Sequence, residues 1–141
     1  MAKHPRGLLD TSLVIDLEKV DPDDLPEAMT ISALTLAELA AGPHAADSPD
    51  ERSRRQDRLQ RAESTFSPLP FDENAARAYG RVYAIVASSG RKPRGHRAVD
   101  LLIAATAVAA GIPLYTSNPA DFEHLESLID VVAVVTRIPK K

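Results

Sequence analysis

Short apolar runs alternate with longer amphipathic segments along this chain, and that alternation limits the fold more than any other feature. The apolar runs at residues 7–10, 28–33, 67–71, 112–116 and 130–135 have the length of buried strands. The stretches between them predict helices over about 11–17, 35–41, 49–65, 72–88 and 97–110. Strands that alternate with helices favour an α/β fold with a central, mostly parallel sheet flanked by helices. A chain of 141 residues suits a single domain over residues 1–141.

The composition excludes several classes of protein. Hydrophobic residues make up 44% of the chain, which argues against disorder. The absence of cysteine excludes disulfide scaffolds, cysteine-based zinc sites and thiol catalysis. The longest apolar run, at residues 101–115, is interrupted by Gly111 and Pro113 and is shorter than the ~20 residues of a membrane span. With no visible targeting segment, we expect a soluble cytoplasmic protein with no membrane partner.

Charge is distributed unevenly although the net charge is only −3. Residues 52–97 contain eleven Lys and Arg against four acidic residues, a net charge of +7, so the rest of the chain carries −10. This asymmetry indicates a positive surface for a polyanion beside an acidic surface elsewhere. For residues 52–61 alone, an ordinary solvated helix face with i,i+4 ion pairs is the favoured interpretation.

Four acidic residues are predicted to fall at one edge of the sheet. Asp10 ends the first strand and Asp121 follows the fourth. Glu38 and Asp100 are expected in the first turns of two helices. Because ligands of parallel sheets bind outside the carboxyl ends of the strands, we expect these side chains to converge there.

Three of these acids also have an ordinary structural explanation. Asp10 alone suits a helix cap, and Glu38 three residues after Thr35 suits a capping box. Asn118, followed by proline, suits a cap with Asp121 favoured by the helix dipole.

Asp100 is harder to explain structurally. Its helical neighbours Ile103, Ala104 and Ala107 form the small apolar face expected to lie on the sheet. A carboxylate on that face is costly unless it is paired or bound to metal. An ion pair with Arg97 is the structural alternative, and metal binding is the favoured interpretation.

A hard divalent cation suits this set of side chains. Clustered carboxylates repel one another and raise each other's pKa values, and Mg²⁺ or Mn²⁺ relieves that repulsion through oxygen ligands. Zinc is disfavoured, because cysteine is absent and the histidines at 4, 44, 96 and 124 are scattered. His96, in a basic loop, is expected to be a surface or phosphate-contacting residue.

Four segments, in order, resemble the motifs of PIN-domain nucleases. They are residues 8–15 (LLDTSLVI), 35–39 (TLAEL), 97–107 (RAVDLLIAATA) and 116–122 (TSNPADF). Their order, spacing and the chain length look like the VapC toxins of bacterial type II toxin–antitoxin systems.

The resemblance implies a PIN fold, a Mg²⁺- or Mn²⁺-dependent endoribonuclease, a homodimer and a cognate antitoxin. It assigns catalysis and metal binding to four acids: Asp10, Glu38, Asp100 and Asp121. It assigns a supporting role to Ser12 and Thr116, with Asn118 standing where some relatives carry aspartate. On charge, we expect Arg94 and Arg97 to hold the RNA backbone, and an acidic antitoxin segment to suit the basic half of the chain.

Three alternative functions remain open from the sequence. A response-regulator receiver with Asp72 as phosphoacceptor would need adjacent acids after the first strand, where Thr11 and Ser12 stand, and a lysine after the last, where residues 137–139 read RIP. A PIN-like domain that binds RNA or protein without cutting is the second. An RNA-processing nuclease without an antitoxin is the third.

Overall fold

The computed structural model describes residues 4–91 and 94–137. Its strands are β1 (Arg6–Leu9), β2 (Ala28–Thr30), β3 (Leu114–Thr116) and β4 (Val131–Ala133). Its α-helices are α1 (Thr11–Ile15), α2 (Ala33–Ala41), α3 (Pro49–Thr65), α4 (Glu73–Ser88) and α5 (His96–Ala110). Short 3-10 turns occur at η1 (Leu17–Lys19), η2 (Pro22–Asp24), η3 (Gly42–Ala45) and η4 (Pro119–Phe122).

The sheet is entirely parallel, with strand order β2-β1-β3-β4, which confirms the predicted α/β fold. From β1 the chain moves outward to β2, and from β3 it moves outward in the other direction to β4. The strand order therefore reverses between β1 and β3. In a parallel sheet, such a reversal opens a crevice beyond the carboxyl ends of the two central strands.

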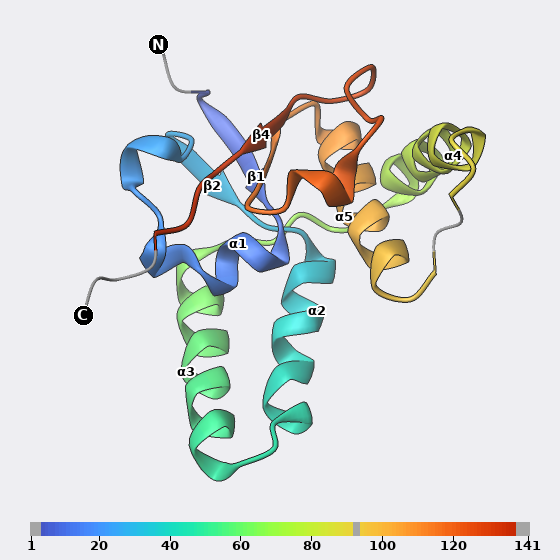
Figure 1. The fold of residues 1–141 in the computed structure, drawn as a ribbon. Helices are drawn as coiled ribbons and strands as arrows, with labels where there is room; N and C mark the ends of the chain where they lie inside the picture. The colour runs from blue at the N-terminus through green and yellow to red at the C-terminus, as the bar shows by residue number, and fades with distance from the viewer. Residues whose placement is uncertain (1–3, 92–93, 138–141) are drawn as a thin grey trace.

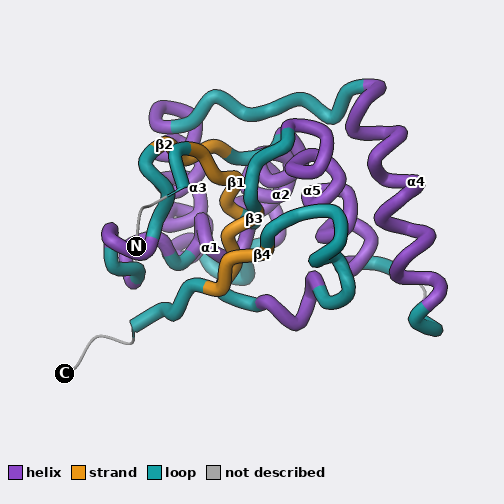
Figure 2. Tube along the Cα trace, turned by 90° about the horizontal axis from the view of Figure 1, so that it is seen from above, coloured by secondary structure: helices purple, strands orange, loops and turns teal. Residues whose placement is uncertain are grey.

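Each face of the sheet has its own apolar core, because successive residues of a strand point to opposite sides. Leu8 pairs with Leu114, and both pack with residues of α4 and α5. Leu9 pairs with Tyr115, and both pack in the second core with residues of α1, α2 and α3. Figure 2 shows α4 and α5 on one side of the strands and α1 and α3 on the other.

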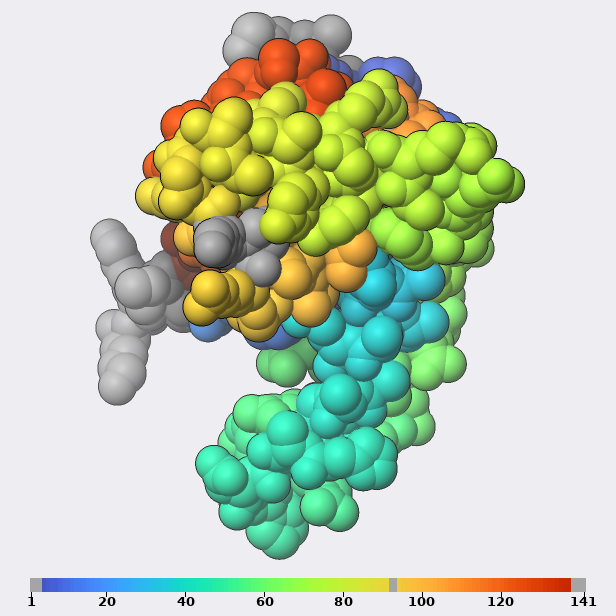
Figure 3. All heavy atoms as spheres, turned by 90° about the vertical axis from the view of Figure 1, so that its right-hand side faces the viewer, coloured from blue at the N-terminus to red at the C-terminus, as the bar shows by residue number. Residues whose placement is uncertain are grey.

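Helices α2 and α3 form an antiparallel hairpin that projects from the rest of the molecule (Figures 1 and 3). Helix α4 packs along α5, away from this hairpin. The basic stretch at residues 52–97 is thus divided between α3, α4 and the start of α5. Within residues 4–91 and 94–137, no helix has the length and apolar character needed to cross a membrane.

The prediction of a strand at residues 67–71 was wrong. Only Leu69 pairs there, in an isolated parallel bridge to Ser32. Its N–H donates to the Ile31 carbonyl at 2.8 Å, and its carbonyl accepts from Ala33 N at 2.8 Å. The bridge does not extend because helix α2 begins at Ala33, where the partner segment leaves the extended conformation, and prolines 68 and 70 leave the opposite edge of this segment without N–H donors.

Several helix starts also differ from the predictions. Asp10, and not Thr11 or Ser12, caps α1. Ser32, and not Thr35, caps α2, so Glu38 lies in the second turn and forms no capping box. Helix α5 begins at His96, which likewise places Asp100 in its second turn. The predicted caps Ser48 and Asp72 are confirmed.

Gly7 in β1 is predicted to be essential for stability because its neighbours leave no room for a side chain. A Cβ there would lie 2.6 Å from Tyr115 Cε1 and 2.8 Å from Pro26 Cγ. Gly7→Ala should therefore lower the free energy of unfolding by about 1–3 kcal/mol. Gly80→Ala, in exposed space within α4, should raise it by about 0.5–1 kcal/mol. Urea denaturation of both variants checks this, and equal effects would contradict the packing of β1.

Candidate active site

A cavity of about 480 Å³ lies at the carboxyl edge of the sheet. All four predicted acids line it: Asp10, Glu38, Asp100 and Asp121. Asp10 follows β1 directly, and Asp121 lies in the turn η4 after β3. Glu38 projects from α2, and Asp100 projects from α5. The predicted convergence of four carboxylates far apart in the sequence is therefore confirmed.

Asp10 is the most firmly held of the four. Its side chain is 3% exposed, and Oδ1 accepts the N–H of Leu13 at 3.0 Å as the cap of α1. The Thr116 hydroxyl donates to Oδ2 at 2.6 Å, and the Ser12 hydroxyl lies 3.0 and 3.1 Å from the two carboxylate oxygens. Ser12 and Thr116, which were expected to support the site, thus both contact the Asp10 carboxylate.

The pKa of Asp10 is raised despite these donors. Burial is the largest cause, and the nearby charge of Asp121 adds to it. The hydrogen bonds from Thr116, Leu13 and Ser12 oppose the rise, because they favour the charged form. Folding therefore keeps a carboxylate in a position where its ionisation is costly, and supplies donors that offset part of the cost.

Glu38 is held by a chain of hydroxyl groups that the sequence did not reveal. The Thr11 hydroxyl donates to Glu38 Oε1 at 2.6 Å, and the Thr11 and Thr35 hydroxyls lie 3.0 Å apart. Since Thr11 gives its proton to Glu38, Thr35 must donate to Thr11. The Ser32 hydroxyl donates in turn to Thr35 at 3.4 Å. Thr35 therefore supports Glu38 through Thr11, where the sequence predicted a cap.

Asp100 is held much less firmly. It is 7% exposed, and its carboxylate accepts no hydrogen bond from the residues at 4–91 and 94–137. His96 Nε2 lies 3.9 Å from Asp100 Oδ1, and His96 Nδ1 lies 3.8 Å from Glu38 Oε2. The exposed imidazole thus stands between two acids, and the alternative ion pair with Arg97 is not formed.

Burial raises the pKa of Asp100 to about 6. The nearby imidazole of His96 lowers it, whereas the charges of Asp121, Asp10 and Glu38 raise it further. All three other acids therefore act electrostatically on Asp100, as expected for a shared site.

Asp121 and Asn118 complete the rim of the cavity. Asp121 is half-buried in the first turn of η4 and accepts no hydrogen bond through its side chain from the described part of the chain. The Asn118 side chain forms no cap, contrary to the prediction, but its backbone N–H donates to Thr116 Oγ1 at 2.9 Å. The Ser117 hydroxyl lies 3.1 Å from that of Ser12, linking the ends of β1 and β3.

The donor set fits a hard divalent cation, because carboxylate and hydroxyl oxygens are the ligands that Mg²⁺ and Mn²⁺ prefer. Within the described ranges, no group of three or more Asp, Glu or His side chains is drawn together as a finished metal cage. Mg²⁺ usually keeps several waters and needs only one or two carboxylates directly. The residues present therefore fit such an ion.

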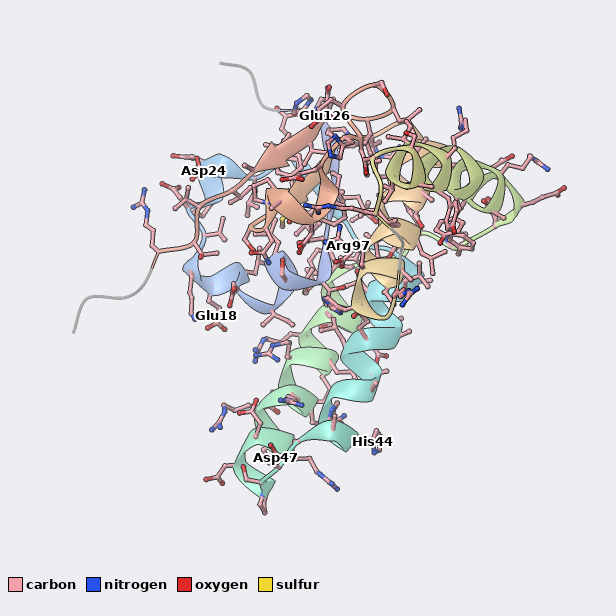
Figure 4. All side chains as sticks on the ribbon, turned by 45° about the vertical axis from the view of Figure 1, so that its right-hand side comes forward. Glu18, Asp24, His44, Asp47, Arg97 and Glu126 are labelled. Carbon is pink, nitrogen blue, oxygen red and sulfur yellow. The ribbon has the colours of Figure 1, made fainter. Side chains whose placement is uncertain are left out.

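The basic residues at the cavity differ from those predicted. Neither Arg94 nor Arg97 is among the residues that line it: Arg97 lies in the first turn of α5 (Figure 4), and Arg94 precedes that helix. Lys92 of the predicted basic loop falls outside the described residues. Arg55 and Arg58 of α3 line the cavity, and nothing in the sequence distinguishes them from the solvated arginines around them.

An all-parallel sheet with a carboxylate-lined cavity where the strand order reverses defines an α/β domain with an acidic, cation-suited site. Residues 8–128 match the PIN domain family, and the chain belongs to that family.

Relatives in this family are similar over nearly the whole chain. Ribonuclease VapC5 of Mycobacterium tuberculosis is 35% identical over 128 residues, which are 89% of this chain and 91% of the relative. VapC ribonuclease Y4jK of Sinorhizobium fredii is 35% identical over 131 residues, covering 82% and 89%.

Solved structures agree with this assignment. The VapBC-5 toxin–antitoxin structure from M. tuberculosis aligns with a TM-score of 0.78 at 34% identity, covering 95% of this chain and 99% of that one. DNA-bound VapBC from Salmonella typhimurium aligns with a TM-score of 0.70 at 29% identity, covering 93% and 97%.

The receiver alternative is overturned by this membership. Asp72, its candidate phosphoacceptor, is an exposed cap whose Oδ1 accepts the N–H of Ala75 at 3.0 Å. It does not line the acidic cavity.

Asp100→Asn should stabilise the metal-free protein above pH 6. A carboxyl whose folded pKa is about 6, against an ordinary value of 3.8, weakens the folded state when it is ionised. In EDTA at pH 8, the variant should gain about 1–3 kcal/mol in free energy of unfolding. The gain should shrink as pH falls through 6 and vanish below about 4. Denaturation at several pH values checks this, and a loss of stability at pH 8 would make Asp100 a structural partner of His96.

Thr116→Val should destabilise the protein, because it removes a donor from a buried carboxylate and an acceptor from Asn118 N. We expect a loss of about 1.5–3 kcal/mol at neutral pH. Thr106→Val is the matched control, since the buried Thr106 hydroxyl donates only to the Leu102 carbonyl of its own helix. Its expected loss is under about 1 kcal/mol. Equal losses of unfolding free energy in the two variants, measured by thermal or urea denaturation, would show that the Thr116–Asp10 hydrogen bond adds no more stability than the Thr106–Leu102 bond.

Proposed function

We propose that this protein is an endoribonuclease that acts as the toxin of a toxin–antitoxin pair. The observation that carries the proposal is the convergence of Asp10, Glu38, Asp100 and Asp121 on one cavity. Relatives that share a third of their residues with the chain are named as ribonucleases, which supports RNA as the substrate.

Mg²⁺ or Mn²⁺ is proposed as the cofactor, held by the four acids. When bound, such a cation supplies Lewis-acid chemistry, lowering the pKa of water and offsetting the charge that develops on a phosphoryl group. The protein's own part is to orient the carboxylates and to hold them close together.

The four acids are proposed to divide this work unequally. Asp10 is fixed by three donors and Glu38 by Thr11, so both orient ligands with little freedom. Asp100 and Asp121 accept no hydrogen bond from the described residues, so they are free to turn toward a ligand. Ser12 and Thr116 support Asp10, and Asn118 supports Thr116 through its backbone.

Arg94 and Arg97 are proposed to hold the RNA backbone outside the cavity, where phosphate contacts give salt-dependent affinity. The chain is further proposed to act as one domain, to form a homodimer and to bind a cognate antitoxin. Structures of related chains are toxin–antitoxin complexes, which supports the antitoxin. The alternatives are an RNA-processing nuclease without an antitoxin and a PIN domain that binds without cutting.

The test is cleavage of structured RNAs by antitoxin-free protein in EDTA, Mg²⁺ or Mn²⁺. Wild type should cut only with a metal, and Asp10→Asn and Asp100→Asn should each lower the rate by at least about a hundredfold. Asp47→Asn is the matched control, because Asp47 is an exposed acid far along the projecting hairpin (Figure 4) and should leave the rate unchanged. No cutting by a clean wild-type sample would favour the binding-only alternative.

A further inference from the structure

One face of α3 is turned toward the acidic cavity. Glu51, Arg55 and Arg58 occupy positions i, i+4 and i+7, and all three line the cavity. Residues at this spacing share one face of a helix. Ala62, one turn beyond Arg58, is buried in the core with α1 and α2. This face is therefore directed into the molecule, whereas other residues of the charged helix face solvent.

The guanidinium of Arg55 is already engaged by the protein. Its Nε donates to Glu51 Oε1 at 3.1 Å, and its Nη1 donates to the Gly42 carbonyl at 2.9 Å. These contacts tie the first turns of α3 to the end of α2. Arg55 therefore fixes the hairpin, and its charge is balanced by Glu51.

Arg58 has no such engagement. It is half-buried, and it forms no hydrogen bond or ion pair with any residue in 4–91 or 94–137. Together with Ile15, it borders both the acidic cavity and a second hollow between α1 and α3. The N–H donors of the Arg58 guanidinium are therefore available to an anion from outside the protein, and their planar arrangement suits phosphate.

The charge of the cavity makes such a residue necessary for a polyanion. Five carboxylates line the cavity once Glu51 is included, and Arg55 forms an ion pair with Glu51. A nucleic-acid strand approaching these acids meets repulsion that a cation at the rim offsets. Arg58 lines this cavity and also the second hollow, and so lies where the two adjoin.

We propose that Arg58 binds a phosphate of the RNA strand adjacent to the phosphate at the acidic cluster. This inference rests on the proposed ribonuclease function and adds a positioning residue to it. Arg58 sets where the strand lies, because its bound phosphate fixes the neighbouring linkage over the acids. It takes no part in bond cleavage itself.

The test measures binding of a short, fluorescein-labelled, single-stranded RNA to the Asp100→Asn chain in EDTA, at several salt concentrations. Adding Arg58→Ala should weaken binding by about tenfold and reduce the slope of log K against log salt by about 0.7, the loss of one phosphate contact. Arg58→Lys should retain the slope. The matched control is Arg52→Ala, which removes the same charge from an exposed position of α3 outside both hollows and should change binding less than about twofold. Arg58→Gln replaces Arg58→Ala if thermal unfolding shows a loss of folded protein.

The outcomes separate this inference from the function on which it rests. If wild type cuts RNA but Arg58→Ala binds as tightly as Arg52→Ala, Arg58 is not a positioning residue and the ribonuclease proposal stands. If the Asp100→Asn chain does not bind RNA and the wild type does not cut it with a metal present, both proposals fail. If Arg58→Ala leaves RNA binding unchanged but weakens binding of an acidic helical peptide, Arg58 serves a protein partner and the inference is overturned.

Discussion

Mutual repulsion among four carboxylates in one partly buried cavity is the constraint around which this structure is arranged. Each acid comes from a different element, and the parallel sheet brings them to one edge because β1 and β3 are neighbours where the strand order reverses. Burial raises the pKa values of Asp10 and Asp100, and the charges of nearby acids raise both further. Such a cluster weakens the folded state unless a cation or a set of donors offsets its charge.

The surrounding hydroxyl groups offset part of that charge, and they do so unevenly. Thr116 and Ser12 donate to Asp10, while a chain from Ser32 through Thr35 and Thr11 reaches Glu38. No described residue donates a hydrogen bond to the carboxylate of Asp100 or Asp121. The site therefore combines two fixed acids with two that have no hydrogen-bonded partner, an arrangement that suits a bound cation which completes its own shell with water.

The sequence predicted the fold and the four acids well because both follow from periodicity and from strand ends. Alternation of apolar runs and helices predicted the parallel sheet, and the carboxyl ends of its strands located Asp10 and Asp121. The sequence predictions were wrong where one local pattern fits two different structures. Thr35 three residues before Glu38 suited a capping box, yet Ser32 is the cap and Thr35 supports Glu38 through Thr11. The apolar run around Leu69 suited a strand, but its partner segment enters helix α2 at Ala33, so only one bridge forms.

Other features depend on tertiary contacts that no pattern encodes. His96 stands between Glu38 and Asp100 only because α5 starts one residue earlier than predicted and faces α2. Arg55 and Arg58 belong to the same charged helix in sequence, and only the packing of α3 on α2 separates an engaged guanidinium from an unpaired one.

The proposed binding of a divalent cation by the acidic cavity through Asp100 is tested most directly by calorimetric titration of the apo protein with Mn²⁺ near pH 6. Because the pKa of Asp100 is about 6, binding should displace a fraction of a proton. The heat should therefore change with the ionisation enthalpy of the buffer. The account predicts this buffer dependence in wild type and its loss, with weaker binding, in Asp100→Asn. Equal Mn²⁺ affinity and equal heats for the two proteins would contradict it.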